Sequence, residues 1–346
     1  MKTIDYSSLK IPIWGLFIIS LMTTLYFAKS IFIPIFLAAI IAFLLSPVVS
    51  FLTRLYIPRA LGSAVVIIFV TTIFSLLLNY LSEPVSLWLE RLPSEISNIE
   101  QKLSPFRESI ETVQKTTETV EEIASMEDTN QTTQDVVVQG PNIFHTLLDG
   151  TQALLISSLS FVVLLYFGLA FGHTLAEKAG SLFQDKNFEE KVSRISSDVQ
   201  KKVSRYLLLI TGINVVLGAI AALLMWVTGM PNPLVWGVST AFFNFIPYIG
   251  PAINLCIITL VSLLTFDGLT QSLIPPALLL LLNLLEGQFV QPMFIGRMFT
   301  INPLIIFLSV LIWGWVWGMA GMFMAVPLLV IAKIIMDNSE ERTSYV

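Results

Sequence analysis

The 346-residue sequence has little charge, a single cysteine and only two histidines. Charged residues make up 12% of the chain, whereas ordinary globular proteins carry about 25%. Hydrophobic residues reach 55%, so there are too few polar groups to cover a surface that faces water. Cys256 has no second cysteine with which to form a disulfide. The composition excludes a water-soluble globule and predicts a membrane protein that crosses the bilayer several times.

The sequence also lacks the signatures of common catalytic and nucleic-acid-binding sites. It contains no H-E-x-x-H, no G-x-S-x-G and no phosphate-binding loop. His145 and His173 are too few for a histidine-based metal site. The 19 basic residues are outnumbered by 24 acidic ones, which gives no excess of positive charge for nucleic acid. We therefore expect no enzyme, no cofactor, no metal and no nucleic-acid partner.

Five apolar runs have about the 20 residues that a helix needs to cross a bilayer. They are Ile11–Ala28, Ile31–Leu52, Leu61–Leu81, Gln152–Gly172 and Tyr206–Val227. The first follows Lys2 and Lys10 in the manner of a signal peptide. It lacks a small-residue cleavage site and continues directly into a second span, so we expect it to be retained.

Two later apolar segments, Pro233–Phe266 and Pro303–Ala332, are too long for one span and are interrupted by glycine and proline. The interruptions are Pro247, Gly250 and Pro251 in the first segment, and Gly314, Gly318, Gly321 and Pro327 in the second. A broken backbone at membrane depth needs partners within the protein or a wet cavity. Each segment is therefore predicted to be a hairpin of two shorter helices. Between them Ser272–Met293 reads as one more span, entered through Pro275-Pro276, which gives about eight membrane segments in an all-α polytopic fold.

Basic residues predict the orientation of these spans. Arg54 and Arg59 follow the second span, and seven lysines and arginines lie between His173 and Arg205. Positive loops stay in the cytoplasm, so both termini are expected to be cytoplasmic. The segment Glu83–Gly150, which has 13 acidic and 4 basic residues, is then expected outside.

The two broken segments open with the same tripeptide, Asn232-Pro233-Leu234 and Asn302-Pro303-Leu304. Each follows one full span, and the orientation above gives them opposite directions. A span and a broken hairpin repeated upside down is how many secondary transporters build a binding site at the bilayer midplane. The alternative is that Asn-Pro is a common way to begin a helix and that the match is accidental.

Glu286 is an ionisable residue in an otherwise apolar span. A carboxylate at such depth costs several kcal/mol unless it is paired, protonated or hydrated, so it indicates a functional site. Helical spacing puts Gln288 and Gln291 within about one and a half turns of it. The alternative is that Glu286 lies at a helix end and reaches the cytoplasmic interface, or that it pairs structurally with Arg297.

A second polar island occupies the sequence Phe242–Pro251. Asn244 and Tyr248 are four residues apart and would share one helical face if the helix continued to Pro247. A helix broken there exposes free carbonyls and amides beside aromatic rings, which suits a small polar, uncharged ligand or a cation. The alternative is a packing kink in which Tyr248 satisfies a carbonyl.

Two amphipathic segments flank the fourth span. Apolar residues from Leu89 to Val120 follow a heptad pattern, interrupted by Pro93 and Pro105, and predict two or three helices. These helices pack on themselves, on the membrane surface or on neighbouring copies. On the cytoplasmic side, the periodicity of Phe188–Val203 predicts an interfacial helix that leads into the fifth span.

Three stretches of this sequence resemble the autoinducer-2 exporter family of bacterial membrane proteins, also called PerM-type permeases. They are PIFLAAIIAFLLSPVVSFLTRLYIPRALGSAVV (Pro34–Val66), FFNFIPYIGPAIN (Phe242–Asn254) and LLEGQFVQPMFIGRMFTINPLIIFLSVLIWGWVWGMAGMFMAVPLLVIAKII (Leu284–Ile335). With the span order and the external insert, the resemblance covers nearly the whole chain. The sequence departs from the family at Asn302, where many members have a histidine, which weakens the case for a titrating side chain there.

The resemblance implies export of a small furanosyl signalling molecule or a similar solute, in a homopentamer with elevator-like moving halves. It does not fix the cargo, because some members resemble sodium/proton antiporters. The residues expected to bind solute or ion, from the resemblance and from the two polar islands, are Asn244, Pro247, Tyr248, Gly250, Pro251, Glu286, Gln288, Gln291, Pro292, Gly296, Arg297, Asn302 and Pro303. Expected partners are membrane lipid, the small-molecule or cation cargo, and further copies of the chain.

The expected organisation has six parts. They are N-terminal spans (1–82), an acidic external helical insert (83–150), a fourth span (151–175), a basic cytoplasmic linker (176–205), a C-terminal transport core (206–336) and a cytoplasmic tail (337–346). Three functions are compatible with it. The first is export of autoinducer-2 or a similar metabolite across the bacterial cytoplasmic membrane. The second is Na⁺(Li⁺)/H⁺ antiport through Glu286, and the third is a scaffold without transport, which would not need Glu286 or broken helices.

Overall fold

The computed structural model describes residues 6–84, 86, 157–172, 186–294 and 301–340. Within these ranges all regular structure is helical, and five helices are long and apolar enough to cross a membrane. A polytopic helical protein is therefore confirmed, whereas eight membrane segments stay a prediction. The acidic insert, apart from its first few residues, lies outside the described residues, and so do Gly296 and Arg297.

Four helices come from the first half of the chain. They are α1 (Tyr6–Phe27), α2 (Lys29–Arg54), Arg59–Pro84 and Ser157–Gly172. The last three share a core, and α1 packs against α2 and α10 (Pro303–Glu340). The buried side chains of α2 that face the last two helices include the small residues Ala38 and Ala42. Ala42 lies against Gly168, so the helices approach closely through small residues, as is common in membranes.

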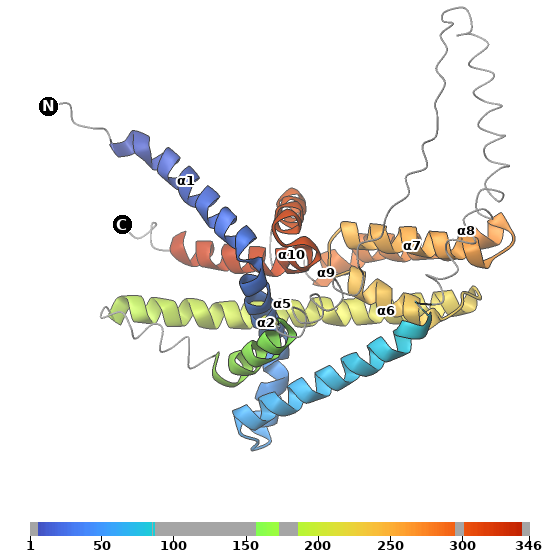
Figure 1. Ribbon diagram of the computed structural model, residues 1–346, viewed down its shortest axis with the longest axis horizontal. Coiled ribbons are helices and arrows are strands. Elements are labelled where there is room, and N and C mark those ends of the chain that lie inside the picture. Colours follow the sequence, from blue (N-terminus) through green and yellow to red (C-terminus); the bar gives the residue numbers. More distant parts are fainter. Residues whose placement is uncertain (1–5, 85, 87–156, 173–185, 295–300, 341–346) are drawn as a thin grey trace, which may run out of the picture.

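Helix α5 (Lys186–Val227) runs through the middle of the molecule (Figure 1). The predicted interfacial helix and the predicted fifth span are one continuous element of 42 residues. Its apolar half crosses α6 (Pro233–Phe243) where Gly218 and Gly237 face each other. A Cβ on either glycine would collide with the backbone of the other helix, so this crossing requires two residues without side chains.

The first predicted hairpin is present as α6 and α7 (Ile249–Thr265), with a break between Phe243 and Ile249. Trp236 donates its indole N–H to the Pro231 carbonyl at 2.8 Å and fixes the entry to α6. Asn254 of α7 donates to the Thr240 hydroxyl at 2.9 Å and accepts from the Ser239 hydroxyl at 2.8 Å. These bonds join the two arms of the hairpin.

Helix α8 (Leu269–Leu285) begins earlier than the sequence predicts, so Pro275-Pro276 lies inside it and not at its entry. Pro276 has no amide hydrogen to offer the Ser272 carbonyl four residues back. The buried Ser262 hydroxyl donates to that carbonyl at 2.6 Å instead. A side chain from α7 thus replaces the bond that proline removes, which allows the helix to continue.

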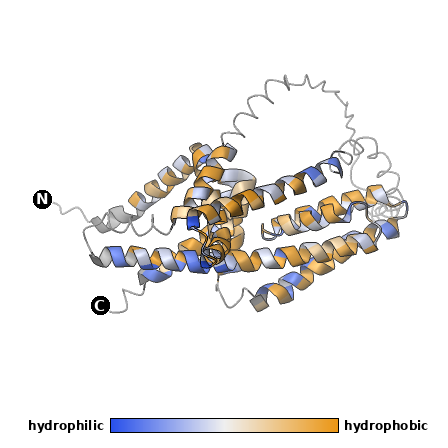
Figure 2. Cartoon of the chain, turned by 90° about the horizontal axis from the view of Figure 1, so that it is seen from below, coloured by the Kyte–Doolittle hydropathy of each residue, from blue (hydrophilic) through white to orange (hydrophobic). Residues whose placement is uncertain are grey.

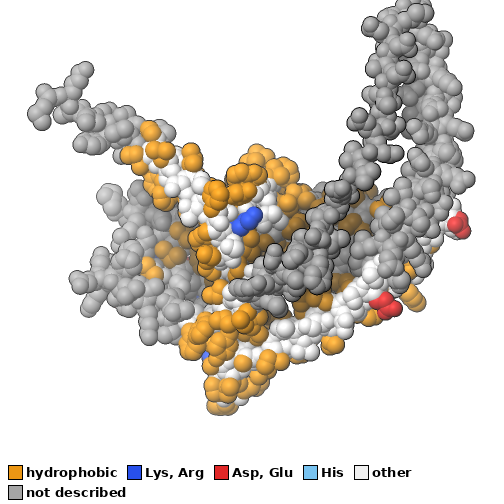
Figure 3. All heavy atoms as spheres, in the orientation of Figure 1, with side chains coloured by type: hydrophobic (Ala, Val, Ile, Leu, Met, Phe, Trp, Pro, Cys, Tyr) orange, Lys and Arg blue, Asp and Glu red, His pale blue; other side chains and the backbone are white. Residues whose placement is uncertain are grey.

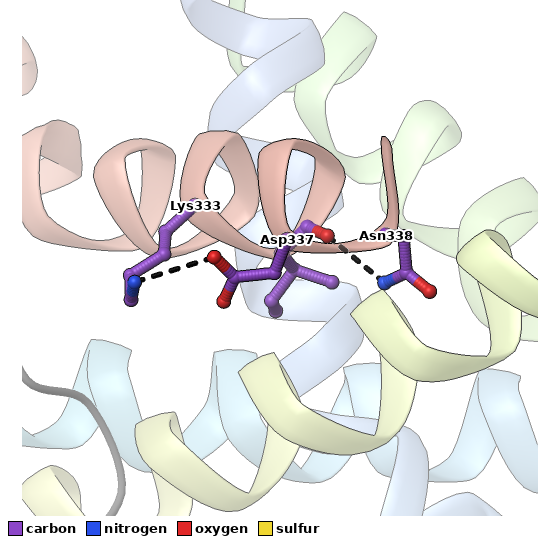
Figure 4. Close-up of polar contacts among 4 residues, drawn as sticks. Lys333, Asp337 and Asn338 are labelled. Carbon is purple, nitrogen blue, oxygen red and sulfur yellow. Dashed lines mark hydrogen bonds and ion pairs between the residues drawn. The ribbon is translucent and has the colours of Figure 1, made fainter. Parts of the chain in front are cut away.

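Helix α10 (Pro303–Glu340) is the second predicted hairpin. Its backbone reverses at Gly318, whose φ of 62° and ψ of −141° only glycine adopts readily. Ser309 donates to the Ala325 carbonyl at 3.1 Å, a contact that a straight helix could not make across 16 residues. At the far end Lys333 pairs with Asp337 at 3.3 Å, and Asn338 donates to the Ile334 carbonyl (Figure 4).

The two hairpins share a set of contacts in the same order. Gly250 packs against the Phe243 carbonyl in the first, and Gly321 packs against the Trp313 carbonyl in the second. A serine also donates across the arms in both, Ser239 to the side-chain oxygen of Asn254 and Ser309 to the backbone carbonyl of Ala325. In the first arm of each hairpin, equivalent residue numbers differ by 70 (Ser239 and Ser309, Phe243 and Trp313). In the second arm of each hairpin they differ by 71 (Gly250 and Gly321, Asn254 and Ala325). The hairpins therefore correspond with one extra residue at the second tip.

The core joins both ends of the chain. Buried residues of α1, α2, α5 and α10 form one cluster, and Trp317 of α10 donates to the Leu25 carbonyl of α1 at 3.0 Å. Hydrophobic colour follows most of the helix lengths in Figure 2, and hydrophobic side chains cover much of the described surface in Figure 3. Large apolar residues such as Trp14 and Trp315 are more than 60% exposed. Such a surface is suited to lipid and not to water.

Candidate functional site

A cavity of about 450 Å³ lies where α5, the α6–α7 break, α8 and α10 meet. The lining contains the side chains of both polar islands that the sequence singles out, including Asn244, Tyr248 and Glu286. Apolar residues of α5 and α10, among them Ile210 and Val330, complete the wall. The volume lies in the range of ligand pockets for small molecules.

Glu286 enters this cavity from a π-helical turn, Glu286–Val290, which follows α8. The Gln291 amide N–H donates to the Glu286 carbonyl, five residues back. Pro292 has no amide hydrogen for the Gln288 carbonyl, which favours the wider turn. In an α-helix, residues 286 and 291 would point about 140° apart. The π turn brings them onto one side, and the Gln291 side chain donates to the Glu286 carboxylate at 2.8 Å.

The Glu286 carboxylate is buried among amides. Glu286 is only 4% exposed, so it does not reach out to the interface as a helix-end residue would. The Asn244 side chain lies beside Glu286 in the lining of the same cavity. Asn244 also donates to the Asn214 side-chain oxygen at 2.9 Å. A carboxylate–amide pair and an amide–amide pair thus meet at one cavity.

The α6–α7 break supplies the other wall of the cavity. Helix α6 ends at Phe243, so it does not continue to Pro247, which was the condition for Asn244 and Tyr248 to share a helical face. Tyr248 instead has a φ of 64° and a ψ of −55°, and the Ile249 N–H donates to the Pro247 carbonyl at 2.7 Å. This is a γ-turn of the strained type. Non-glycine residues held in such conformations cluster at ligand clamps and switch regions.

Asn214 belongs to the site although it is not among the residues predicted from the sequence. It lies on α5 and is completely buried, and its Nδ2 atom has no hydrogen-bond partner. A buried amide N–H without a partner costs about 1–3 kcal/mol, and such groups call for a water or a ligand. The place of Asn214 in the middle of the apolar span Tyr206–Val227 is the sequence feature that could have predicted its role. Asn283 of α8 also lines the cavity and was missed because it lies among leucines.

The predicted site residues fall into three groups. The cavity lining includes Asn244, Pro247, Tyr248, Pro251, Glu286, Gln288 and Gln291. Gly250 lies in the backbone contact of the hairpin, and Asn302 begins α10 by accepting the Leu304 N–H at 2.9 Å, with Pro303 as the first helical residue. Pro292 belongs to the short α9 (Gln291–Phe294), whereas Gly296 and Arg297 lie outside the described residues.

The cavity combines one carboxylate, several amides and two tyrosines with apolar walls. Amides offer both donors and acceptors, and the carboxylate accepts only. Hydroxyl groups of a small polar molecule can pair with all of them. Amide and carboxylate oxygens are also the ligands that hard cations prefer. The described residues contain no group of three or more His, Cys, Asp or Glu side chains that could hold a metal ion.

Comparison with known proteins finds a match over most of the chain. Residues 16–341 match the family model described as AI-2E family transporter. The chain is 28% identical over 338 residues to "AI-2 transport protein TqsA" of Escherichia coli (strain K12), covering 97% of this chain and 94% of that protein.

Two further relatives are named as transport proteins. "Putative transport protein YhhT" of Escherichia coli (strain K12) is 24% identical over 323 residues, or 93% of this chain and 89% of the relative. "Putative transport protein YueF" of Bacillus subtilis (strain 168) is 22% identical over 324 residues, or 90% of this chain and 85% of the relative. The relatives match along nearly their whole length, so the resemblance extends well beyond the polar islands.

Proposed function

The chain belongs to the AI-2E transporter family, and on that premise we propose that it exports autoinducer-2 or a similar small polar metabolite through the cavity at Glu286. Transport, and not catalysis, is the activity of the family. The name of the relative TqsA supports autoinducer-2 as the cargo. The expected location is the cytoplasmic membrane of a bacterium, with both termini inside.

One observation carries the proposal, namely that Glu286 and the α6–α7 break line the same cavity. The carboxylate comes from the π turn after α8, and the asparagine and tyrosine come from a break more than 35 residues earlier in the chain. Neither feature is needed to hold a simple helical bundle together. Their convergence supports a binding site for a solute with several hydroxyl groups.

The two corresponding hairpins support alternating access through an inverted repeat. Their shared contacts at Gly250 and Gly321, and at Ser239 and Ser309, argue against an accidental match of the Asn-Pro openings. The hairpins also touch each other, since Phe245 lies 5.0 Å from Phe323 between ring centroids. Repeats of this type move against each other around a fixed site. Elevator-like movement within a homopentamer is the arrangement that the family resemblance implies.

Na⁺(Li⁺)/H⁺ antiport is the second candidate, because the oxygens around Glu286 suit a cation. Gln291 donates to the Glu286 carboxylate and Asn244 lines the same cavity, and a cation would replace the amide donor on the carboxylate. A carboxylate that exchanges a proton for a cation is what such an antiporter requires. The two candidates use the same residue but differ in what crosses the membrane.

The test uses purified protein in sealed liposomes. Vesicles are loaded with autoinducer-2, and its efflux is measured for wild type and for Glu286→Gln. A parallel assay follows proton movement with an internal pH dye after addition of Na⁺ or Li⁺. We expect solute efflux from wild type, and a reduction of at least tenfold for Glu286→Gln, because the neutral amide offers one acceptor in place of two charged oxygens.

The outcomes separate the candidates. Solute efflux without cation-driven proton movement supports export of the metabolite. Cation-driven proton movement without solute efflux, again lost in Glu286→Gln, supports antiport instead. Equal solute efflux from liposomes with wild-type protein and from empty liposomes rejects autoinducer-2 as the cargo.

A further inference from the structure

A second cavity, of about 600 Å³, lies between α2 and α5. Ser46, Pro47 and Ser50 of α2 form one side of it, and α5 residues between Ser197 and Leu209 form the other. Arg59, at the start of the next helix, closes one edge. None of these residues lines the cavity at Glu286, so the two are separate sites.

The charge of this second cavity is of one sign. Arg59, Lys201 and Arg205 line it, and no acidic residue is among the described lining residues. The Arg59 Nε atom donates to the Leu169 carbonyl at 2.9 Å, which fixes the side chain and leaves its terminal nitrogens available. Lys201 and Arg205 are exposed and Arg59 is half-buried, so three cations line an open cavity, where they repel one another. An anion between them would remove that repulsion.

Buried hydroxyl groups add neutral donors to the same cavity. Ser204 is only 6% exposed, and its hydroxyl oxygen has no hydrogen-bond partner. Ser46, 8% exposed, accepts a hydrogen bond from the Gln200 side chain at 3.1 Å, so its own hydroxyl hydrogen can point elsewhere. Buried polar groups are rarely left unpaired without a water or ligand nearby. A partner with several acceptor oxygens is what these donors lack.

We propose that this cavity between α2 and α5 binds a phosphate group. A tetrahedral phosphate has several acceptor oxygens and negative charge, and it matches guanidinium, ammonium and hydroxyl donors arranged around one space. The predicted orientation puts the cavity near the cytoplasmic membrane surface, where two sources exist. The group comes either from the headgroup of an anionic lipid or from a soluble phosphate compound.

A comparison of Lys202 with Lys201 distinguishes a defined phosphate site from a general attraction to the membrane. Lys202 is adjacent to Lys201 on α5 but does not line the cavity, and it pairs with Asp198 at 3.9 Å. A general attraction of basic residues to the membrane surface would involve both lysines equally. A defined phosphate site would depend on Lys201 and Arg205, and not on Lys202.

Inorganic phosphate is the probe for the soluble source. Wild type, the double variant Lys201→Gln/Arg205→Gln, Ser204→Ala and the control Lys202→Gln are purified in neutral detergent. Phosphate is titrated at constant ionic strength, balanced with chloride, and binding is followed by calorimetry. We expect the double variant to raise the dissociation constant at least tenfold and Ser204→Ala about threefold. Lys202→Gln should stay within twofold of wild type.

Lipid vesicles test the membrane source. The same four proteins are mixed with vesicles of phosphatidylglycerol in phosphatidylcholine, or of phosphatidylcholine alone, and the lipid that stays bound after extraction is counted by native mass spectrometry. Retention of phosphatidylglycerol by wild type and Lys202→Gln, but not by the double variant, assigns the site to a lipid headgroup.

Each result decides between the sources or rejects the site. Phosphate binding that depends on Lys201 and Arg205, without selective lipid retention, assigns it to a soluble compound. Equal behaviour of wild type and the double variant towards both probes overturns the proposal, as does an equal loss in Lys202→Gln. Unchanged thermal unfolding of all variants in phosphate-free buffer ensures that the comparison concerns binding and not folding.

Discussion

Individual buried amides in this protein have two different roles, which their hydrogen bonds distinguish. Asn254 uses both ends of its side chain to join the arms of the first hairpin. Asn214 uses only its oxygen, which accepts from Asn244, and leaves its nitrogen unpaired beside the Glu286 group. A fully paired amide stabilises packing, whereas a half-paired one costs stability and indicates a place for water or ligand.

Replacing Asn214 by leucine is expected to impair transport with little effect on stability. Asn214→Leu removes an acceptor from Asn244 but also removes a buried nitrogen without a partner, so the two effects on the free energy of unfolding largely cancel. We expect thermal unfolding in detergent to shift by no more than a few degrees. Solute efflux or cation-driven proton flux from liposomes, whichever wild type carries out, should fall at least tenfold because Asn244 loses its orientation.

Asn254→Leu is the matched control and should give the opposite pattern. It leaves the Ser239 and Thr240 hydroxyls without their cross-arm partner, at a cost of about 2–3 kcal/mol. A clear drop in the unfolding temperature is expected. If Asn214→Leu destabilised the protein as much as Asn254→Leu while transport per folded molecule was unchanged, Asn214 would be structural only.

At the scale of the elements, the breaks in the helices follow from proline and glycine. The sequence predicts that Pro233–Phe266 and Pro303–Ala332 are interrupted, and the chain reverses between Phe243 and Ile249 and again at Gly318. It does not predict the π turn at Glu286–Val290. Proline and glycine act locally and leave a visible pattern, but a π turn competes with an α-helix of nearly the same sequence preference.

Closely packed glycines make the hairpins sensitive to single methyl groups. In Gly250→Ala the new Cβ would overlap the Phe243 carbonyl, and in Gly321→Ala it would overlap the Trp313 carbonyl. Because backbone must move in both cases, we expect each variant to lose about 3 kcal/mol of stability. Thermal unfolding in detergent, followed by loss of monodisperse protein, measures the effect.

Gly212→Ala provides the control for these two substitutions. Gly212 lies inside α5, and nothing lies within 4 Å of the position that its Cβ would occupy. Alanine favours a helix over glycine by about 1 kcal/mol, so the unfolding temperature should stay the same or rise. Equal destabilisation by all three substitutions would contradict the close contacts in the hairpins.

The whole molecule is organised around α5, which lines both cavities. Ser204 lies at the proposed phosphate site, and Ile210 lies at the cavity of Glu286. The N-terminal helices pack on one part of α5, and α6 and α8 pack on another. This single helix therefore connects the basic surface region to the proposed transport site.

The predicted orientation of the molecule is testable with single cysteines. In a Cys256→Ser background, Asp267→Cys is expected outside and Asp337→Cys inside, since one span and one hairpin separate the two positions. Both residues are exposed. A membrane-impermeant maleimide should label Asp267→Cys in right-side-out vesicles and Asp337→Cys in inverted vesicles.

The labelling experiment also tests the inverted repeat. Opposite accessibility of the two cysteines requires an odd number of crossings between Asp267 and Asp337. The Cys256→Ser protein without an added cysteine is the control for background labelling. Labelling of both positions from the same side would contradict the inverted arrangement of the hairpins.

The sequence by itself determined that the chain enters a membrane, where its helices break, and that Glu286 is unusual, because hydropathy, proline and an isolated charge are local properties. The family followed from long ordered stretches such as Phe242–Asn254. Only the tertiary structure decided that Asn214 and Asn244 meet Glu286 in one cavity, and that Lys201 and Arg205 face Ser46 and Arg59 in another. Contacts of this kind depend on the angle and position at which distant helices cross. That crossing results from packing between helices, which the sequence of a single segment does not determine.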